Sequence, residues 1–133
     1  MKTLCIRLRR GDDLLAGIRS VAVRENLTAA VVLSAVGCVS RACVRDAGGV
    51  KLREIPEPCE IVSLNGTVSR NRCHLHIALS KEDLSTAGGH LVEGCIVNTT
   101  CELVLGLLDG WRFGTEQDAQ TGYDEIVFQR EET

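Results

Sequence analysis

Short segments in which apolar and polar residues alternate constrain the fold of this chain more than any other feature of its sequence. Alternation is typical of half-buried strands, because successive side chains of a strand point to opposite faces of the sheet. The clearest case is the segment 72–80, where Leu75, Ile77 and Leu79 mark the apolar face. We expect about seven strands, drawn from residues 3–9, 28–36, 38–45, 50–54, 59–65, 72–80, 95–108 and 123–129.

The connections between these segments are mostly short and carry turn residues. Gly37 interrupts an apolar run at 28–36, which we expect to be buried on both faces, and Asn65-Gly66 predicts a turn. Residues 81–89 are predicted as a polar loop, and residues 111–122 show no clear pattern. Short connections join antiparallel neighbours, because parallel strands need long crossovers.

One helix is predicted near the amino terminus. Apolar residues recur at helical spacing from Leu14 to Ala22, and the helix is expected to end near Asn26. Asp12 is the predicted N-cap, with Asp13 in the first turn. One helix with many short-linked strands predicts an α+β fold with a largely antiparallel sheet, in a single domain spanning 1–133.

Charge and cysteine content narrow the function classes. The net charge is −3, which argues against attachment to nucleic acid by bulk charge. Seven cysteines occur with no Cys-x-x-Cys pair, so neither a disulfide framework nor a cysteine-rich zinc site is indicated. Free cysteines favour a reducing compartment, and no signal peptide or long apolar run is evident, so we expect a cytoplasmic protein that does not enter a membrane.

The three histidines are the best candidate for a chemical site. His74 and His76 are two residues apart on one predicted strand and therefore share a face, whereas Cys73 points the other way. His90 follows Gly88-Gly89, which we expect to turn sharply and bring it to the other two. Three histidines are a common ligand set of zinc sites with an open fourth position, so His74, His76 and His90 are predicted to bind one divalent metal, with zinc as the first candidate.

A plainer interpretation stays open, in which three surface histidines bind a structural metal or none. Affinity for a metal should fall below about pH 6.5, the ordinary pKa of histidine. Glu60 and Glu102 lie within apolar strands. Each is a candidate general acid or base, or a partner of a histidine, although an ion pair with an arginine is the more common role.

Several segments together resemble the plants-and-prokaryotes-conserved (PPC) domain, which also occurs in plant AT-hook proteins. The matching segments are Arg9–Leu14, Ala35–Ala42, Glu60–Thr67, His74–Ser80 and Gly88–Leu91 with Gly94. The resemblance implies an α+β fold, a homotrimer and a protein of the DNA-binding class. The chain carries no Arg-Gly-Arg-Pro hook and is acidic, so we expect DNA binding to be weak or absent.

The PPC fold is also similar to that of acetolactate decarboxylase, a zinc enzyme whose metal site has the pattern of His74, His76 and His90. Two functions therefore compete: a trimeric binding or regulatory module with a three-histidine metal site, and a small zinc-dependent enzyme acting on a small carbonyl or carboxylate compound. The remaining catalytic residues of that enzyme do not map onto this chain, so neither a reaction nor a ligand follows.

Overall fold

The computed structural model describes residues 1–132, which contain one helix and nine strands, two more than about seven expected. The helix is α1 (Leu14–Arg24). The strands are β1 (Lys2–Arg9), β2 (Ala30–Arg45), β3 (Leu52–Ile55), β4 (Cys59–Ser69), β5 (Arg72–Lys81), β6 (Thr86–Leu91), β7 (Ile96–Leu107), β8 (Trp111–Gln117) and β9 (Asp124–Arg130). Among these residues, no helix is long and apolar enough to cross a membrane.

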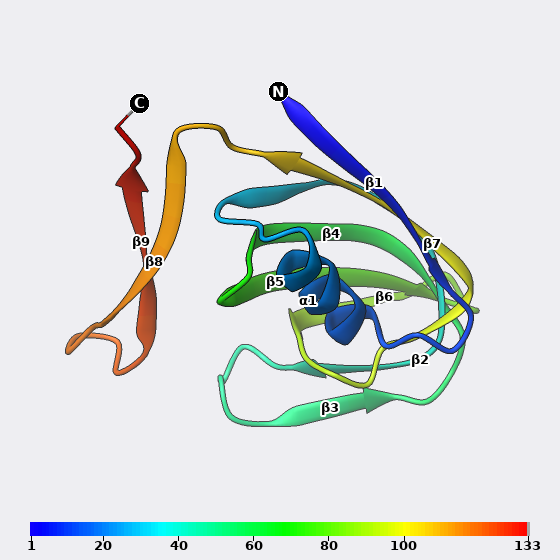
Figure 1. The fold of residues 1–133 in the computed structure, drawn as a ribbon. Helices are drawn as coiled ribbons and strands as arrows, with labels where there is room; N and C mark the ends of the chain where they lie inside the picture. Colours follow the sequence, from blue (N-terminus) through cyan, green and yellow to red (C-terminus); the bar gives the residue numbers. More distant parts are fainter. Residues whose placement is uncertain (133) are drawn as a thin grey trace.

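Seven of the strands form one curved sheet, and every strand pair in it is antiparallel. The order is β1-β7-β2-β4-β5-β6, and β3 pairs with the end of β2. The last residues of β2 also pair with β6, at Val44 with Leu91 and Arg45 with His90, so the sheet curls back on itself. Figure 1 shows α1 lying inside this curve. The α+β, largely antiparallel fold expected from the sequence is confirmed.

The core lies between α1 and the concave face of the sheet and is almost entirely aliphatic. From the helix it takes Leu14, Ile18 and Val21, all at most 3% exposed. From the sheet it takes the apolar face of β5 as predicted, with Leu75 and Leu79 at most 1% exposed. The opposite face of β5 is therefore left free to carry polar side chains.

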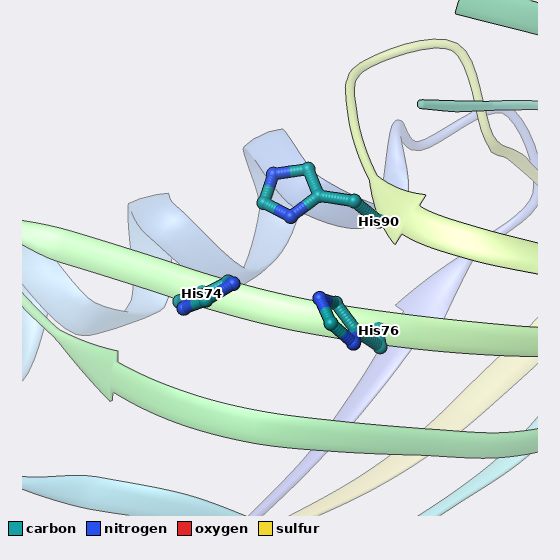
Figure 2. A group of neighbouring side chains, drawn as sticks. All are labelled: His74, His76 and His90. Atoms are coloured by element: carbon teal, nitrogen blue, oxygen red, sulfur yellow. The ribbon is translucent and has the colours of Figure 1, made fainter. Parts of the chain in front are cut away.

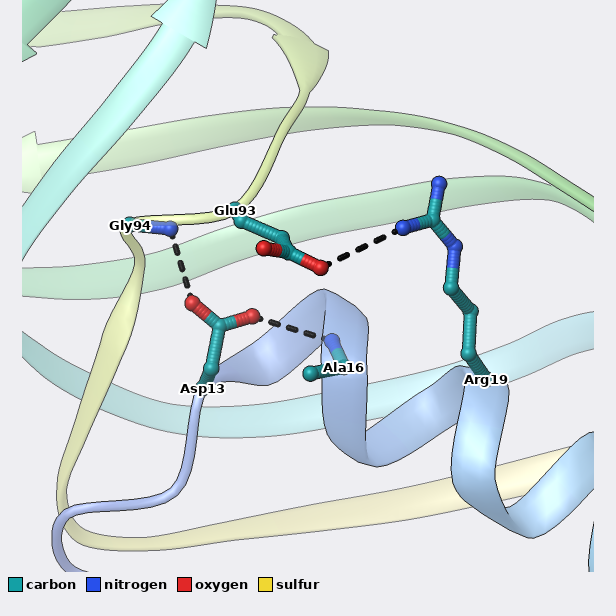
Figure 3. A network of polar contacts seen from close by, with 5 residues as sticks. All are labelled: Asp13, Ala16, Arg19, Glu93 and Gly94. Atoms are coloured by element: carbon teal, nitrogen blue, oxygen red, sulfur yellow. Dashed lines mark hydrogen bonds and ion pairs between the residues drawn. The ribbon is translucent and has the colours of Figure 1, made fainter.

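The helix begins one residue later than expected. Asp13, and not Asp12, is the N-cap, because an Asp13 carboxylate oxygen accepts from the Ala16 backbone N–H at 2.9 Å. The other oxygen accepts from the Gly94 N–H at 2.7 Å, which ties the helix to the turn before β7 (Figure 3). Asp12 instead accepts from the Arg9 N–H.

The division of residues 28–45 into two strands is wrong, as is burial on both faces. β2 runs through Gly37 without a break, and irregular pairing with β7 absorbs the change of register there. Gly37 is needed because a Cβ at this position would lie 2.2 Å from the Thr100 carbonyl oxygen. Leu33 and Val36 are 50% and 56% exposed, because none of the described elements covers the outer face of this strand.

Two predicted connections are also strand. Asn65-Gly66 is not a turn but lies within β4, where Gly66 is opposite Leu75. A Cβ on Gly66 would lie 1.9 Å from the His74 carbonyl oxygen, so a glycine is needed here because β4 and β5 approach each other closely. The second half of the predicted 81–89 loop belongs to β6, which pairs with β5. Within the segment 111–122, for which no element is predicted, residues 111–117 form β8.

Strands β8 and β9 form a separate antiparallel hairpin that stands beside the main sheet (Figure 1). Phe113 anchors it, being 7% exposed, and its N–H donates to the Thr28 carbonyl at 3.0 Å. The start of β9 thereby comes close to the polar face of β5. Asp124 and Glu125 line the same hollow as His74, although fifty residues of sequence separate them.

Candidate metal centre

The three histidines form one cluster on the face of the sheet opposite to the core. His74 and His76 project from β5, as their shared parity predicts, and His76 lies directly opposite His90 of β6. The ring centroids are 5.2 to 5.6 Å apart, and one nitrogen from each ring lies within 4.8 Å of the others. Figure 2 shows the three rings gathered around a common space.

The means by which His90 reaches the cluster differs from the prediction. It sits on a strand and is placed by the β5–β6 pairing, not by a sharp Gly88-Gly89 turn. The glycines serve close approach instead: a Cβ on Gly88 would lie 2.1 Å from the Ile77 carbonyl oxygen, and one on Gly89 would lie 2.6 Å from that of Arg45. Backbone pairing therefore sets the positions of all three histidines on one face of the sheet.

The surroundings of His74 and His90 favour neutral rings. Burial lowers the pKa of His90 to about 4, and the neighbouring Arg45 charge adds to this effect. Burial also lowers the pKa of His74, followed by the charge of Arg72, while Glu125 acts in the opposite direction. A metal binds only the neutral ring, so protons compete with it at a lower pH than the 6.5 expected from the sequence, and at His90 only near pH 4.

The cluster fits a metal ion by the chemistry and spacing of its donors. His90 Nδ1 is buried and has no hydrogen-bond partner, which costs free energy unless something binds there. In a tetrahedral zinc site with Zn–N bonds of ~2.0–2.1 Å, neighbouring nitrogens lie roughly 3.3 Å apart. The nitrogens here lie within 4.8 Å, so small rotations of the side chains bring them to that spacing.

Two arginines flank the histidines. Arg45 lies opposite His90 on β2, and Arg72 precedes His74 by two residues on the same face of β5. An Arg72 guanidinium nitrogen donates to His74 Nδ1 at 3.4 Å. A metal at Nδ1 would displace this donor, and a metal at Nε2 would leave a proton on Nδ1, so in either case Arg72 has to move when His74 binds a metal.

Two hollows open at the cluster. One, of about 280 Å³, is lined by His74, His76 and Arg72 together with Asn65 and Thr67 of β4. The other, of about 250 Å³, lies between His74, His90, both arginines and the start of β9. The rings are therefore accessible from two sides, which leaves room for a small molecule beside a bound ion.

Glu60 and Glu102 lie away from this cluster. Both are exposed, Glu60 opposite Cys38 and Ser80, and Glu102 opposite Arg7 and Val36. Within residues 1–132 neither carboxylate is in an ion pair. The prediction that each pairs with an arginine is therefore wrong.

Sequence reasoning missed Arg45, Arg72 and Glu125. The parity that pairs His74 with His76 also places Arg72 on the same face, so Arg72 could have been found. Arg45 and Glu125 reach the site through long-range strand pairing and through a hairpin with no sequence pattern, so no local signal identified them.

Comparison with known proteins places this geometry in context. The chain is 36% identical over 129 residues to the bifunctional protein GlmU of a Synechococcus strain, covering 97% of this chain and 20% of that protein. The chain thus spans about a fifth of the length of that relative. A hypothetical protein from Salmonella has the same fold, with 31% identity, a TM-score of 0.93 and coverage of 97% and 94% of the two chains.

Two further structures of the same fold are described in different terms, one as a metal-containing protein and one as a DNA-binding candidate. A metal-containing protein from Archaeoglobus fulgidus is 31% identical, with a TM-score of 0.80 and coverage of 96% and 94%. A candidate DNA-binding protein from Bacteroides thetaiotaomicron shares the fold at 20% identity, with a TM-score of 0.85 and coverage of 96% and 93%. The Plants and Prokaryotes Conserved (PCC) domain matches residues 1–109, which include the helix, the whole curved sheet and all three histidines. The family expected from the sequence is confirmed, and this chain belongs to the Plants and Prokaryotes Conserved domain family.

Proposed function

We propose that this chain is a metal-binding module in which His74, His76 and His90 together bind one divalent ion, with zinc as the first candidate. The observation that carries the proposal is the convergence of one ring nitrogen from each of the three histidines within 4.8 Å, and the buried His90 Nδ1 without a hydrogen-bond partner supports it. A relative of known structure, 31% identical, is a metal-containing protein. Imidazole suits zinc well, and three such ligands leave a fourth position for water or another molecule.

The experiment is metal analysis of untagged protein after zinc loading and removal of free metal. The wild type should carry one zinc per chain, and His74→Ala, His76→Ala and His90→Ala should each lose most of it. Ser80→Ala is the matched control, because Ser80 lies on the same face of β5 without belonging to the cluster. A wild type without zinc, or three histidine variants with full occupancy, would overturn the proposal.

Assembly into a homotrimer is part of the proposed module. Its support is an apolar surface that the monomer leaves uncovered: Leu33 and Val36 of β2 and Val62 of β4 are 50% to 61% exposed. Apolar side chains gathered on the outer face of a sheet mark an interaction surface. Sedimentation equilibrium should report three chains per particle, and a stable monomer at micromolar concentration would contradict this.

We expect this chain to bind DNA only weakly, in a way that depends on salt and not on DNA sequence. The net charge of −3 supports this expectation, because affinity for phosphates depends on a basic surface. The DNA-binding candidate of the same fold is only 20% identical and lends support to the fold alone. A gel-shift titration that finds tight, sequence-selective binding at physiological salt would contradict this expectation.

A second candidate function is a small metalloenzyme acting on a carbonyl or carboxylate compound. The observation that favours it is the pair of hollows of about 280 and 250 Å³ that open on the histidines. A bound divalent ion would supply Lewis-acid polarisation of a carbonyl oxygen. On the protein side, the neutral histidines would hold the ion and Asn65 and Thr67 would line the approach to it.

A further inference from the structure

Building on the proposed metal centre, we propose that Arg45 and Arg72 hold the carboxylate of a small anionic ligand beside the three histidines. The ligand class that fits is a short monocarboxylate with a few carbon atoms. The two arginines belong to the chain itself, so their binding of a carboxylate can be tested separately from metal binding.

The first observation is that both guanidinium groups lack partners for buried nitrogens. Arg45 Nε and Arg72 Nη1 are buried and make no hydrogen bond within the described residues. Among the described residues, neither arginine has a carboxylate within 4.0 Å. Leaving a buried charged donor without an acceptor costs several times the free energy that a typical hydrogen bond contributes. A ligand that supplies an acceptor here therefore recovers that free energy on binding.

The second observation is the arrangement of the strands. Arg45, His90 and His76 lie opposite one another across β2, β6 and β5, and therefore form one row on one face. Arg72, His74 and His76 form a second line along β5. The arginines thus stand at the two open ends of the cluster, and the hollow of about 250 Å³ lies between them.

The third observation is the charge of that hollow. Arg45 and Arg72 bring two positive charges, and Asp124 and Glu125 of β9 bring two negative ones. Glu125 already accepts a hydrogen bond from Thr121, and neither carboxylate pairs with either arginine. A divalent ion at the histidines would leave two positive charges in excess, one of which a monocarboxylate would offset.

Arginine binds both carboxylate and phosphate through parallel N–H donors. Without a bound ion the charges of the two arginines and of Asp124 and Glu125 cancel, so the hollow has no net attraction for a dianion over a monoanion, and phosphate serves as the comparison anion in the test. A hollow of about 250 Å³ is smaller than the ~300–1,000 Å³ of sites for drug-sized ligands, so the compound is short.

The test is nuclear magnetic resonance of protein labelled with nitrogen-15, following the Nε–H signals of Arg45 and Arg72. Pyruvate, its neutral amide and inorganic phosphate are titrated into zinc-loaded and chelator-treated protein. Pyruvate should shift both signals in both forms, and it should bind more tightly when zinc is present. The amide should shift neither signal. Arg45→Gln and Arg72→Gln should each weaken pyruvate binding at least tenfold. Arg41→Gln is the control, because Arg41 is an exposed residue of β2, the strand that carries Arg45, and this change should leave pyruvate binding unchanged.

Arg72→Lys guards against a variant that fails to fold, because it keeps the charge but loses the planar pair of donors, and it should weaken binding by less than Arg72→Gln. The proposal is overturned if pyruvate shifts neither signal in either form, if the amide shifts them equally, if only phosphate binds, or if both glutamine variants bind pyruvate as the wild type does. Zinc content measured on the same samples separates this failure from failure of the metal centre: one zinc per chain without pyruvate binding rejects only the arginine site.

Discussion

His76 of β5 and His90 of β6 lie directly opposite each other across an antiparallel strand pair. Side chains opposite one another share a face and have Cβ atoms ~4.5–5.5 Å apart, so the pairing register alone brings the two rings together. A slip of one residue would turn His90 to the core face. The candidate metal centre therefore depends on whatever keeps β5 and β6 in register.

Gly88→Ala should destabilise the protein by at least about 2 kcal/mol and weaken zinc binding, because the added Cβ would lie 2.1 Å from the Ile77 carbonyl oxygen and push β6 from β5. Urea unfolding and zinc content measure the two effects. Gly114→Ala in β8 is the control, since its Cβ would meet nothing nearer than 3.5 Å. Equal stability of the two variants would show that close approach at Gly88 is not required.

The candidate site was predictable from the sequence in part. Parity on a strongly alternating strand places His74 and His76 on one face and Leu75 on the other, and this relation depends only on neighbouring residues. The position of His90 depends on pairing between strands, which local pattern does not encode. It was assigned to the cluster with the wrong local structure, a loop in place of β6.

Two of the wrong predictions about the fold have the same physical cause. Asn65-Gly66 and Gly88-Gly89 look like turns because glycine favours them, yet both lie in strands. There the missing Cβ allows backbones to approach closely, a requirement set by partner strands far along the chain. Leu33 lies in an apolar run, which predicts burial, but an apolar run does not distinguish a core strand from one with an exposed apolar face.

Asp13→Ala should lower the free energy of unfolding by about 1–2 kcal/mol, because it removes the helix cap and the acceptor of the Gly94 N–H (Figure 3). Asp12→Ala, which loses only the contact with the Arg9 N–H, should cost less. Urea unfolding at neutral pH measures both, and zinc content should stay unchanged. If Asp12→Ala were the more damaging change, the assignment of the cap to Asp13 would be wrong.

Leu33→Glu and Val36→Glu should convert the proposed trimer to monomers, because each places a charge on the uncovered outer face of β2. Sedimentation equilibrium of wild type and variants measures the change. Val50→Glu is the control: Val50 is 82% exposed in the turn between β2 and β3, so a charge there should leave assembly intact. Variants that remain trimers would place the interface elsewhere.

Stability of the metal-free protein should fall as pH drops from about 6.5 towards 4. Burial lowers the pKa of His90 in the folded protein to about 4, whereas the unfolded chain takes up a proton near the ordinary value of about 6.5. Between these values the unfolded state binds more protons, so the free energy of unfolding decreases with falling pH and is highest above 6.5. For this partly buried group the loss by pH 5 should be on the order of 1 kcal/mol. Urea unfolding in the presence of a chelator at pH 7.5, 6 and 5 measures it, and His90→Asn should flatten the profile. An equal loss in that variant would assign the pH dependence to other groups, either His74, whose pKa burial also lowers, or the carboxylates, because His90 could no longer contribute.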